Sequence, residues 1–120
     1  MQSSFRALTA RELEILEKLL EPEFPGRDEL RQQVGSLTAR QLFQDGTLDL
    51  NCGATLRAPV TCRVPTEGEY FDADGFRVNV LLHVVDGLMN ELEILKLHPS
   101  KIINPPEARN LFVVTHYRQR

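Results

Sequence analysis

The sequence predicts an α+β fold in which two N-terminal helices pack on a mostly antiparallel meander sheet of five to six strands. Apolar residues recur at helical spacing in the first third of the chain, and they alternate with polar residues in much of the rest. Asp-Gly pairs, which are typical of tight turns, separate the alternating segments. Helices followed by a run of strands favour helices gathered on one face of an antiparallel sheet.

Length and composition predict one globular domain. The chain has 120 residues, of which 42% are hydrophobic and 26% charged, so one core can form without disulfides. We expect a single domain over residues 1–120, with a helical part at 8–35, a sheet part at 36–98 and a proline-containing tail at 99–120.

The same composition excludes several classes of protein. Two cysteines are too few for a disulfide scaffold, and residues 1–10 lack the apolar core of a signal peptide. No apolar run reaches the ~18 residues of a membrane span. A net charge of −3 disfavours nucleic acid as a partner. We therefore expect a cytoplasmic protein that binds neither nucleic acid nor membrane.

Both helices are predicted from their ends as well as from their apolar faces. Thr9 and Glu12 have the spacing of a capping box, in which each side chain binds the other's backbone N–H. The leucines that follow recur on one face, which we interpret as core: Leu13, Leu16 and Leu20. A shorter helix is predicted over residues 27–34, with Gly35 as its stop.

The first strands carry weaker signals. Asp45-Gly46 predicts a hairpin between residues 42–43 and 48–50. Val60, Cys62 and Val64 alternate with polar residues and predict a further half-buried strand. Cys52 and Cys62 fall on the apolar faces of these segments, so we expect reduced, unreactive thiols that bind no metal.

The strongest strand signal is an alternating apolar row formed by Phe76, Val78, Val80, Leu82 and Val84. Asp86-Gly87 then turns the chain into a second strand. We predict a three-residue loop at 85–87 with Gly87 in the left-handed conformation, which pairs Val80 with Leu92. A two-residue loop is rejected, because a shift by one residue would turn the glutamates of the second strand into the core.

The outer face of this hairpin carries the candidate binding residues, Asn79, His83, Glu91 and Glu93. Two carboxylates beside a histidine can perform acid–base chemistry or hold a metal ion, but they are also typical of a solvated strand face. We interpret them as polar contacts of a binding face. No catalytic residue, metal site or cofactor is expected.

Other motifs carry no chemistry. Asp72-Ala73-Asp74-Gly75 resembles part of a calcium loop, but taking Gly75 as the sixth position puts Leu81 where a bidentate glutamate is needed. A hairpin turn explains the same residues. Nine residues separate Cys52 from Cys62, unlike the short pairs of zinc sites. The glycines are scattered singly, so no phosphate-binding loop is expected.

Charge is unevenly distributed along the second half of the chain. Residues 67–93 hold seven acidic residues and one basic residue, whereas residues 94–120 hold five basic residues and one acidic residue. Internal compensation, with the tail lying over the acidic hairpins, is the favoured explanation. The alternative is an acidic surface that meets a basic partner by electrostatic steering.

Three functions stay open on these residues. The first is a non-enzymatic interaction module whose partner is a protein with a basic surface. The second is a small-ligand-binding protein or small enzyme that uses Glu91 or Glu93 as a base with His83 as its partner. The third is a homo-oligomeric structural protein that pairs through residues 111–117, from Leu111 to Tyr117, which predict a strand at a sheet edge or between subunits.

One stretch of sequence also resembles a known family. The acidic turn at 72–75, the VLLHV run at 80–84 with its Asp86-Gly87 turn, and the ELEI run at 91–94 followed by Lys96 resemble a family of small uncharacterised bacterial proteins. The chain departs from the pattern at Val85, where an acidic residue is common, and at Leu95, where an aromatic is common. The resemblance implies this fold and a bacterial cytosolic setting, and through some relatives an immunity or toxin-associated role. It carries no established activity.

Overall fold

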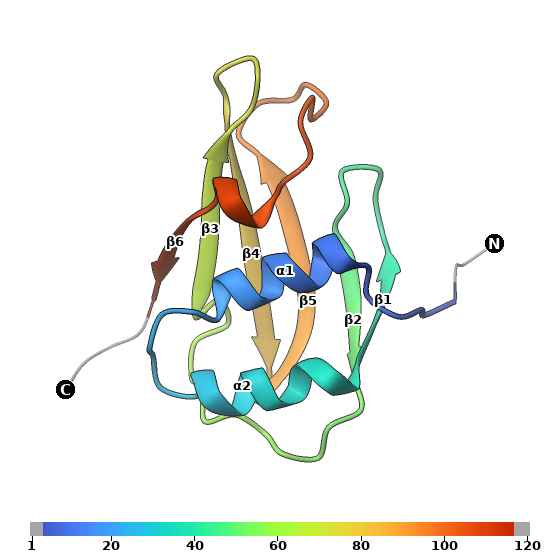
Figure 1. Ribbon diagram of the computed structural model, residues 1–120, viewed down its shortest axis with the longest axis vertical. Coiled ribbons are helices and arrows are strands. Elements are labelled where there is room, and N and C mark those ends of the chain that lie inside the picture. The colour runs from blue at the N-terminus through green and yellow to red at the C-terminus, as the bar shows by residue number, and fades with distance from the viewer. Residues whose placement is uncertain (1–3, 117–120) are drawn as a thin grey trace.

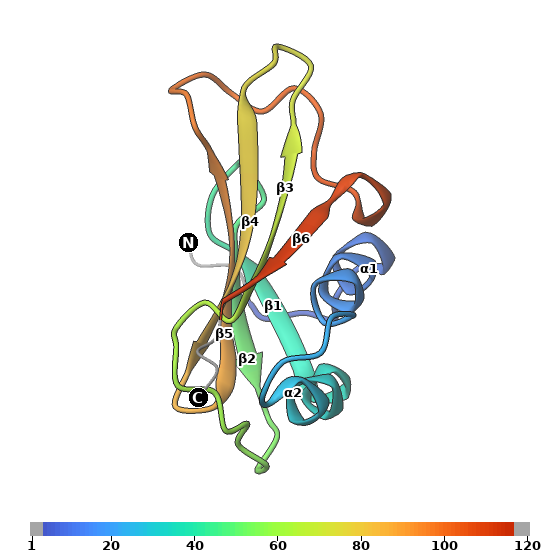
Figure 2. The same cartoon turned by 90° about the vertical axis from the view of Figure 1, so that its left-hand side faces the viewer.

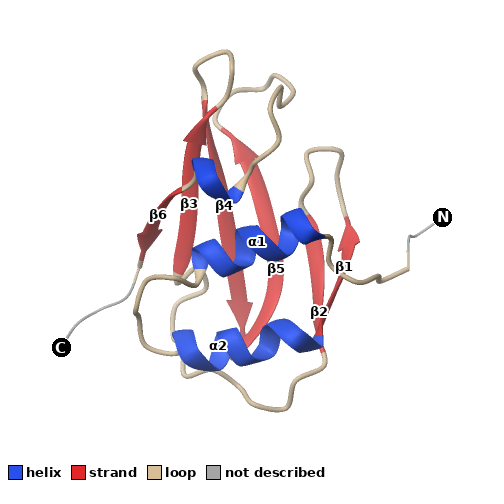
Figure 3. Ribbon diagram, in the orientation of Figure 1, coloured by secondary structure: helices blue, strands red, loops and turns tan. Residues whose placement is uncertain are grey.

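The computed structural model describes residues 4–116, which form two α-helices and one six-stranded antiparallel sheet (Figure 1). The predicted α+β class is therefore confirmed. Short 3-10 turns occur at Val34–Ser36 and Ala108–Asn110. The longer elements, coloured by type in Figure 3, are α1 (Ala10–Leu19), α2 (Arg27–Gln33), β1 (Leu37–Gln41), β2 (Leu48–Cys52), β3 (Thr66–Phe71), β4 (Arg77–Val85), β5 (Leu88–Lys96) and β6 (Phe112–Thr115).

The two helices cover one face of the sheet, and the hydrophobic core lies between the layers (Figure 2). Buried side chains from the helices meet the inward-facing residues of the strands, and among the most buried are Leu16, Leu19, Leu30, Val78, Val80, Leu82 and Leu92. No helix within residues 4–116 is both long enough and apolar enough to cross a membrane.

Helix α1 begins where the sequence predicts. The hydroxyl of Thr9 accepts a hydrogen bond from the backbone N–H of Glu12 at 3.2 Å, and the Glu12 carboxylate accepts one from the N–H of Thr9 at 2.9 Å. This reciprocal pair satisfies donors that have no partner inside the helix, which confirms the predicted capping box.

Helix α2 differs from its prediction at its end. It stops at Gln33 and continues as a 3-10 turn through Gly35, which does not adopt the left-handed conformation of a glycine stop. The left-handed glycine is instead Gly26, at the start of the helix, with φ of 92°. Gln33 is fully buried and uses its side-chain amide to bind two other segments of the fold, the β2–β3 connection and the β4–β5 hairpin.

The sheet is not a simple meander. Its strand order is β1-β2-β5-β4-β3-β6, so β1–β2 and β3–β4–β5 are consecutive neighbours, whereas β2 pairs with β5 and β3 with β6. Strand β2 pairs with β5, with Leu48 opposite Leu92 and Asp49 opposite Glu91. The predicted first hairpin exists, but its first strand ends at Gln41, and the residues expected to belong to it, Leu42 and Phe43, lie exposed in the loop.

The strand predicted around Val60, Cys62 and Val64 is absent, because residues 53–65 form an irregular connection from β2 to β3. Flanking prolines at positions 59 and 65 lack N–H donors. The segment instead bonds to the end of the β4–β5 hairpin: the N–H of Ala58 donates to the carbonyl of Gly87, and the N–H of Val84 donates to the carbonyl of Arg63. The alternation of apolar and polar residues in this segment therefore belongs to a loop that packs with one side on the protein.

The β4–β5 turn corrects the predicted loop length. Asp86 and Gly87 both have positive φ, 53° and 76°, and they form the two-residue turn that the sequence argument rejected. His83 pairs with Glu91 and Val84 with Met89, so Asn90 is an extra residue that forms a β-bulge. Because of this extra residue, Glu91 and Glu93 still point away from the core despite the shorter loop. Glu91 and Glu93 therefore lie on the predicted face of the sheet, but Val80 pairs with Ile94 and not with Leu92.

The tail ends in an edge strand. Strand β6 pairs antiparallel with β3, with Glu69 opposite Phe112 and Thr66 opposite Thr115. The predicted edge strand is thus observed at residues 112–115, although Tyr117 lies outside the described residues. Leu111, just before β6, is buried against Gly68, where an added Cβ would lie 3.2 Å from the leucine side chain.

Candidate functional site

The sheet face turned away from the helices carries all four predicted site residues, and we call it the open face. Asn79 and His83 on β4, and Glu91 and Glu93 on β5, are half-buried on this face. Within residues 4–116 no helix crosses it (Figure 2), and residues 60–65 pass over one end, beside the β4–β5 turn.

His83 is held between two partners. The Nε–H of Arg63 donates to His83 Nδ1 at 2.9 Å, and His83 Nε2 lies 2.8 Å from a carboxylate oxygen of Glu93. Because an arginine can only donate, Nδ1 must be the acceptor nitrogen. The ring proton therefore sits on Nε2 and points at Glu93. The sequence does not indicate Arg63, because it predicts a separate strand at residues 60–64 and not a loop beside His83.

Glu91 lies directly opposite His83 across the two strands. One ligand atom from each of His83, Glu91 and Glu93 lies within 4.8 Å of the other two. The Glu91 carboxylate makes no hydrogen bond or ion pair with any residue in the described range 4–116, unlike that of Glu93. Glu91 is therefore the group of this cluster that is free to accept a donor from outside.

The cluster has the ligand types of a site for zinc or a similar divalent ion. It lacks the hydrogen bond that the second ring nitrogen of a metal-binding histidine normally donates. A metal on His83 Nε2 would replace the proton that Glu93 accepts, and Nδ1 would then carry the proton. Arg63 cannot accept that proton, so its guanidinium would have to leave. A metal-binding histidine normally donates its second ring proton to a carboxylate or carbonyl. The arrangement described is that of a hydrogen-bonded polar face.

Asn79 does not belong to this cluster. It pairs across the sheet with Leu95 and lies four residues before His83 on β4, with Leu81 between them on the same face. Its amide nitrogen donates to Glu67 at 3.2 Å, and its side-chain oxygen is buried without a hydrogen-bond partner among the described residues. The structure thus divides the four predicted residues into a group of three and one residue that contacts β3.

The open face is acidic at its centre and apolar at one end. Five carboxylates lie on it, at Asp49, Glu67, Glu69, Glu91 and Glu93, against three arginines at positions 40, 63 and 77. Arg40 neutralises Asp49 through a contact of 2.6 Å. At the opposite end from the β4–β5 turn, four apolar side chains are exposed on the same face: Phe71, Leu95, Leu97 and Phe112.

The acidic turn after β3 has a structural role. Lys96 Nζ lies 2.9 Å from Asp72 and 2.7 Å from Asp74, and the lysine side chain is almost completely buried. Asp72 also accepts hydrogen bonds from the backbone N–H groups of Ile103 and Asn104, both at 2.8 Å. These contacts tie the tail to the hairpin end and explain the two aspartates without a calcium ion.

The charges in this turn have shifted pKa values. Burial alone would raise the pKa of Asp72, but backbone donors and Lys96 outweigh it and hold the pKa well below its usual range. The bond from Lys96 lowers the pKa of Asp74, and burial of Lys96 is outweighed by its two carboxylates, so its pKa is raised. Burial, together with the Asp72 charge, raises the pKa of Tyr70 to about 12.

Both cysteines are free and half-buried. The thiol of Cys52, on β2, lies 3.6 Å from the side-chain oxygen of Gln33. Cys62 lies in the irregular connection and not on a strand, and its thiol donates to the carbonyl of His116 at 2.9 Å. The expectation that both thiols face the apolar side of a strand is therefore wrong for Cys62.

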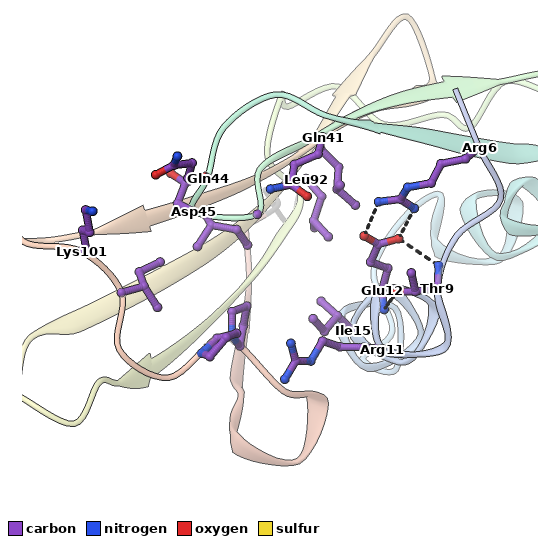
Figure 4. Close-up of a pocket in the computed structure, with 16 residues that line it drawn as sticks. Arg6, Thr9, Arg11, Glu12, Ile15, Gln41, Gln44, Asp45, Leu92 and Lys101 are labelled. Carbon is purple, nitrogen blue, oxygen red and sulfur yellow. Dashed lines mark hydrogen bonds and ion pairs between the residues drawn. The ribbon is translucent and has the colours of Figure 1, made fainter. Parts of the chain in front are cut away.

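A ligand-sized cavity lies on the other side of the sheet. It is formed by α1, the β1–β2 loop and residues 101–106, and Leu92 and Ile94 lie in its lining (Figure 4). These two residues face the core, so the cavity encloses neither glutamate of the open face. Sequence reasoning missed it, because its three segments are far apart in the chain and no local pattern joins them.

Fold and site together define a small α+β protein with an open-faced antiparallel sheet. A family model matches residues 5–106, most of the chain, and its description is a domain of unknown function, DUF6984. The chain therefore belongs to the DUF6984 family, which is an uncharacterised family with no established activity. No curated protein matches the chain, and no solved structure does.

Proposed function

We propose that the protein is a non-enzymatic interaction module whose open face binds a partner protein with a basic surface. The observation that carries this proposal is the composition of that face, an acidic centre beside exposed phenylalanine and leucine side chains. Mixed faces of this kind, with apolar anchors and charged surroundings, are typical of transient protein interfaces. An immunity or toxin-associated role would be one instance of such binding.

Two features favour binding over catalysis at this face. The cavity formed by α1, the β1–β2 loop and residues 101–106 lies behind the sheet, whereas a small-molecule enzyme would enclose its acid–base groups in a pocket. The Nε2 proton of His83 is also directed into an internal hydrogen bond with Glu93. Glu91, without an internal partner in the described range, is the carboxylate best placed to meet a lysine or arginine of the partner.

Affinity capture from the native host, read by mass spectrometry, tests the proposal. The immobilised bait is compared with Glu91→Gln/Glu93→Gln and with a control pair, Glu14→Gln/Glu17→Gln, which removes two exposed charges from α1. We expect a basic partner that is lost with the first pair, kept with the second, and released by raised salt. Capture of the same partners by both variants would contradict the proposal.

A second candidate is a homo-oligomer through β6. This strand is an edge of the sheet and exposes Phe112, 68% accessible, beside Phe71 on the neighbouring strand. Edge strands with apolar side chains are templates for pairing with another copy. Light scattering coupled to gel filtration would give a dimer mass that Phe112→Asp reduces to a monomer. A monomer for the unaltered chain would remove this candidate.

A further inference from the structure

The cavity behind the sheet has the dimensions of a small-molecule site. Its volume is about 510 Å³, within the range of roughly 300–1,000 Å³ found for ligand pockets. Three walls form it: the start of α1 with the segment before it, the loop between β1 and β2, and the tail at residues 101–106 (Figure 4). The first and last of these walls lie almost a hundred residues apart in the chain.

The floor of the cavity is apolar and rigid. Ile15 of α1, Leu48 of β2, and Leu92 and Ile94 of β5 contribute to it, and all four are at least 95% buried in the core. Side chains this tightly packed hold one conformation, so the floor is formed before any ligand arrives. Ile102 from the tail closes it on one side. Such a floor suits the apolar body of a ligand.

The lining carries three cationic side chains, Arg6, Arg11 and Lys101, against two carboxylates, Glu12 and Asp45. Glu12 is neutralised by Arg6, whose two terminal nitrogens lie 2.8 and 2.9 Å from the two carboxylate oxygens. That bond lowers the pKa of Glu12, so the pair stays ionised and internally satisfied. One carboxylate oxygen of Asp45 accepts a hydrogen bond from the backbone N–H of Thr47.

Two cations at the rim, Lys101 and Arg11, are not bound by Glu12. Lys101 Nζ forms no ion pair with any residue of the described segment 4–116. Among residues 4–116 Arg11 forms one ion pair, with Glu107 at 3.5 Å, and Glu107 also binds Arg109 at 2.8 Å. Figure 4 shows the Arg11 guanidinium extending from α1 toward the tail, and Lys101 on the far side of the lining from the Arg6–Glu12 pair.

From this geometry we propose that the cavity binds a small monocarboxylate with an apolar body, such as a medium-chain fatty acid. The hydrocarbon lies on the floor formed by Leu48, Leu92 and Ile94, and the carboxylate is bound at the rim by Arg11 or Lys101. Arginine and lysine are the side chains that bind carboxylates through charge-assisted hydrogen bonds. All residues that line the cavity fall within the part of the chain that the family model matches.

The test is a titration of the full chain with decanoate, followed by backbone amide NMR shifts. Decanol and decylamine serve as probes of equal length with no charge and with positive charge. We expect saturable binding of decanoate below about 1 mM, with shifts confined to the cavity lining. Decylamine should bind at least tenfold more weakly. Equal binding of decylamine, shifts centred on the open face, or no saturable binding would each overturn the proposal.

Matched variants separate charge from shape. Arg11→Gln/Lys101→Gln removes the two rim cations that Glu12 does not bind, and it should weaken decanoate binding at least tenfold while leaving decanol binding unchanged. Arg31→Gln/Arg77→Gln, an exposed pair away from the cavity, controls for net charge and should bind as the unaltered chain does. Ile102→Phe adds bulk to the lining and should weaken both probes. Unchanged decanoate binding in the first pair would overturn the role of the rim.

Discussion

Gln33 joins three parts of the fold that are distant in sequence, and its replacement gives the sharpest test of the packing. Its side-chain nitrogen donates to the carbonyls of Leu56 at 3.0 Å and Gly87 at 2.7 Å. Its oxygen accepts the backbone N–H of Met89 at 3.1 Å. The residue is 0% exposed, so water cannot replace these bonds without a rearrangement of α2.

The substitution Gln33→Leu keeps the volume and removes every bond. Loss of its partner leaves the N–H of Met89 buried and unsatisfied, at a cost of about 1–3 kcal/mol. The lost bond to Leu56 adds about 0.5–1.5 kcal/mol. The carbonyl of Gly87 keeps the N–H of Ala58 at 2.8 Å, so it adds little. We expect the free energy of unfolding to fall by about 2–4 kcal/mol.

Urea denaturation followed by circular dichroism measures this change. The exposed neighbour provides the control, because Gln32→Leu should alter the free energy of unfolding by no more than about 0.5 kcal/mol. A fall of less than ~1 kcal/mol for Gln33→Leu, with an unchanged urea slope, would refute the reasoning. It would mean that the amide of Gln33 is not bonded to the β4–β5 turn in solution.

Three other predictions concern the cap, the two faces of the hairpin and the acidic turn. Thr9→Ala should lower the free energy of unfolding by about 1 kcal/mol through loss of the cap bond, and a urea melt with no change would place the helix start elsewhere. Glu91→Gln/Glu93→Gln should change the same quantity by less than ~1 kcal/mol, whereas Leu82→Ala, fully buried, should cost about 2–5 kcal/mol; the reverse order would invert the two faces. Asp72 has a lowered folded pKa, so its charge stabilises the fold above its unfolded pKa of about 3.9, and this contribution is lost as the pH falls through the folded pKa. Asp72→Asn should therefore flatten the fall in stability below about pH 4 in acid titrations followed by circular dichroism, and a slope equal to that of the unaltered chain would assign it to other carboxylates.

Sequence reasoning succeeds where a short segment decides its own structure. The capping box of Thr9 and Glu12 involves residues three apart, so its spacing alone is sufficient evidence. The facing of Glu91 and Glu93 also follows from alternation on one strand, and burial of the intervening Leu92 enforces it. Both predictions depend on neighbours along the chain, and both are confirmed.

Prediction from sequence fails where contacts between residues distant in the chain determine the local structure. A two-residue turn and a bulge at Asn90 give the same facing as a three-residue loop, so alternation could not distinguish them. The β2–β3 connection packs closely against the β4–β5 turn, and this contact requires glycine at position 87. An added Cβ on Gly87 would lie 2.7 Å from the carbonyl oxygen of Ala58. The pairing of β2 with β5 and the cavity behind it likewise depend on residues more than forty positions apart.

The strand order also sets the sequence of events during folding. The β4–β5 hairpin closes through two residues and can form within about 1–10 μs. Strand β2 must wait for Leu48 to meet Leu92, and β6 for Thr115 to meet Thr66, because long loops close at a higher entropic cost. Until β2 arrives, the hairpin exposes its apolar row and the free edge of β5, and exposed edges of this kind can start aggregation. We expect the like charges of Glu91 and Glu93 on that edge strand to disfavour pairing between nascent chains.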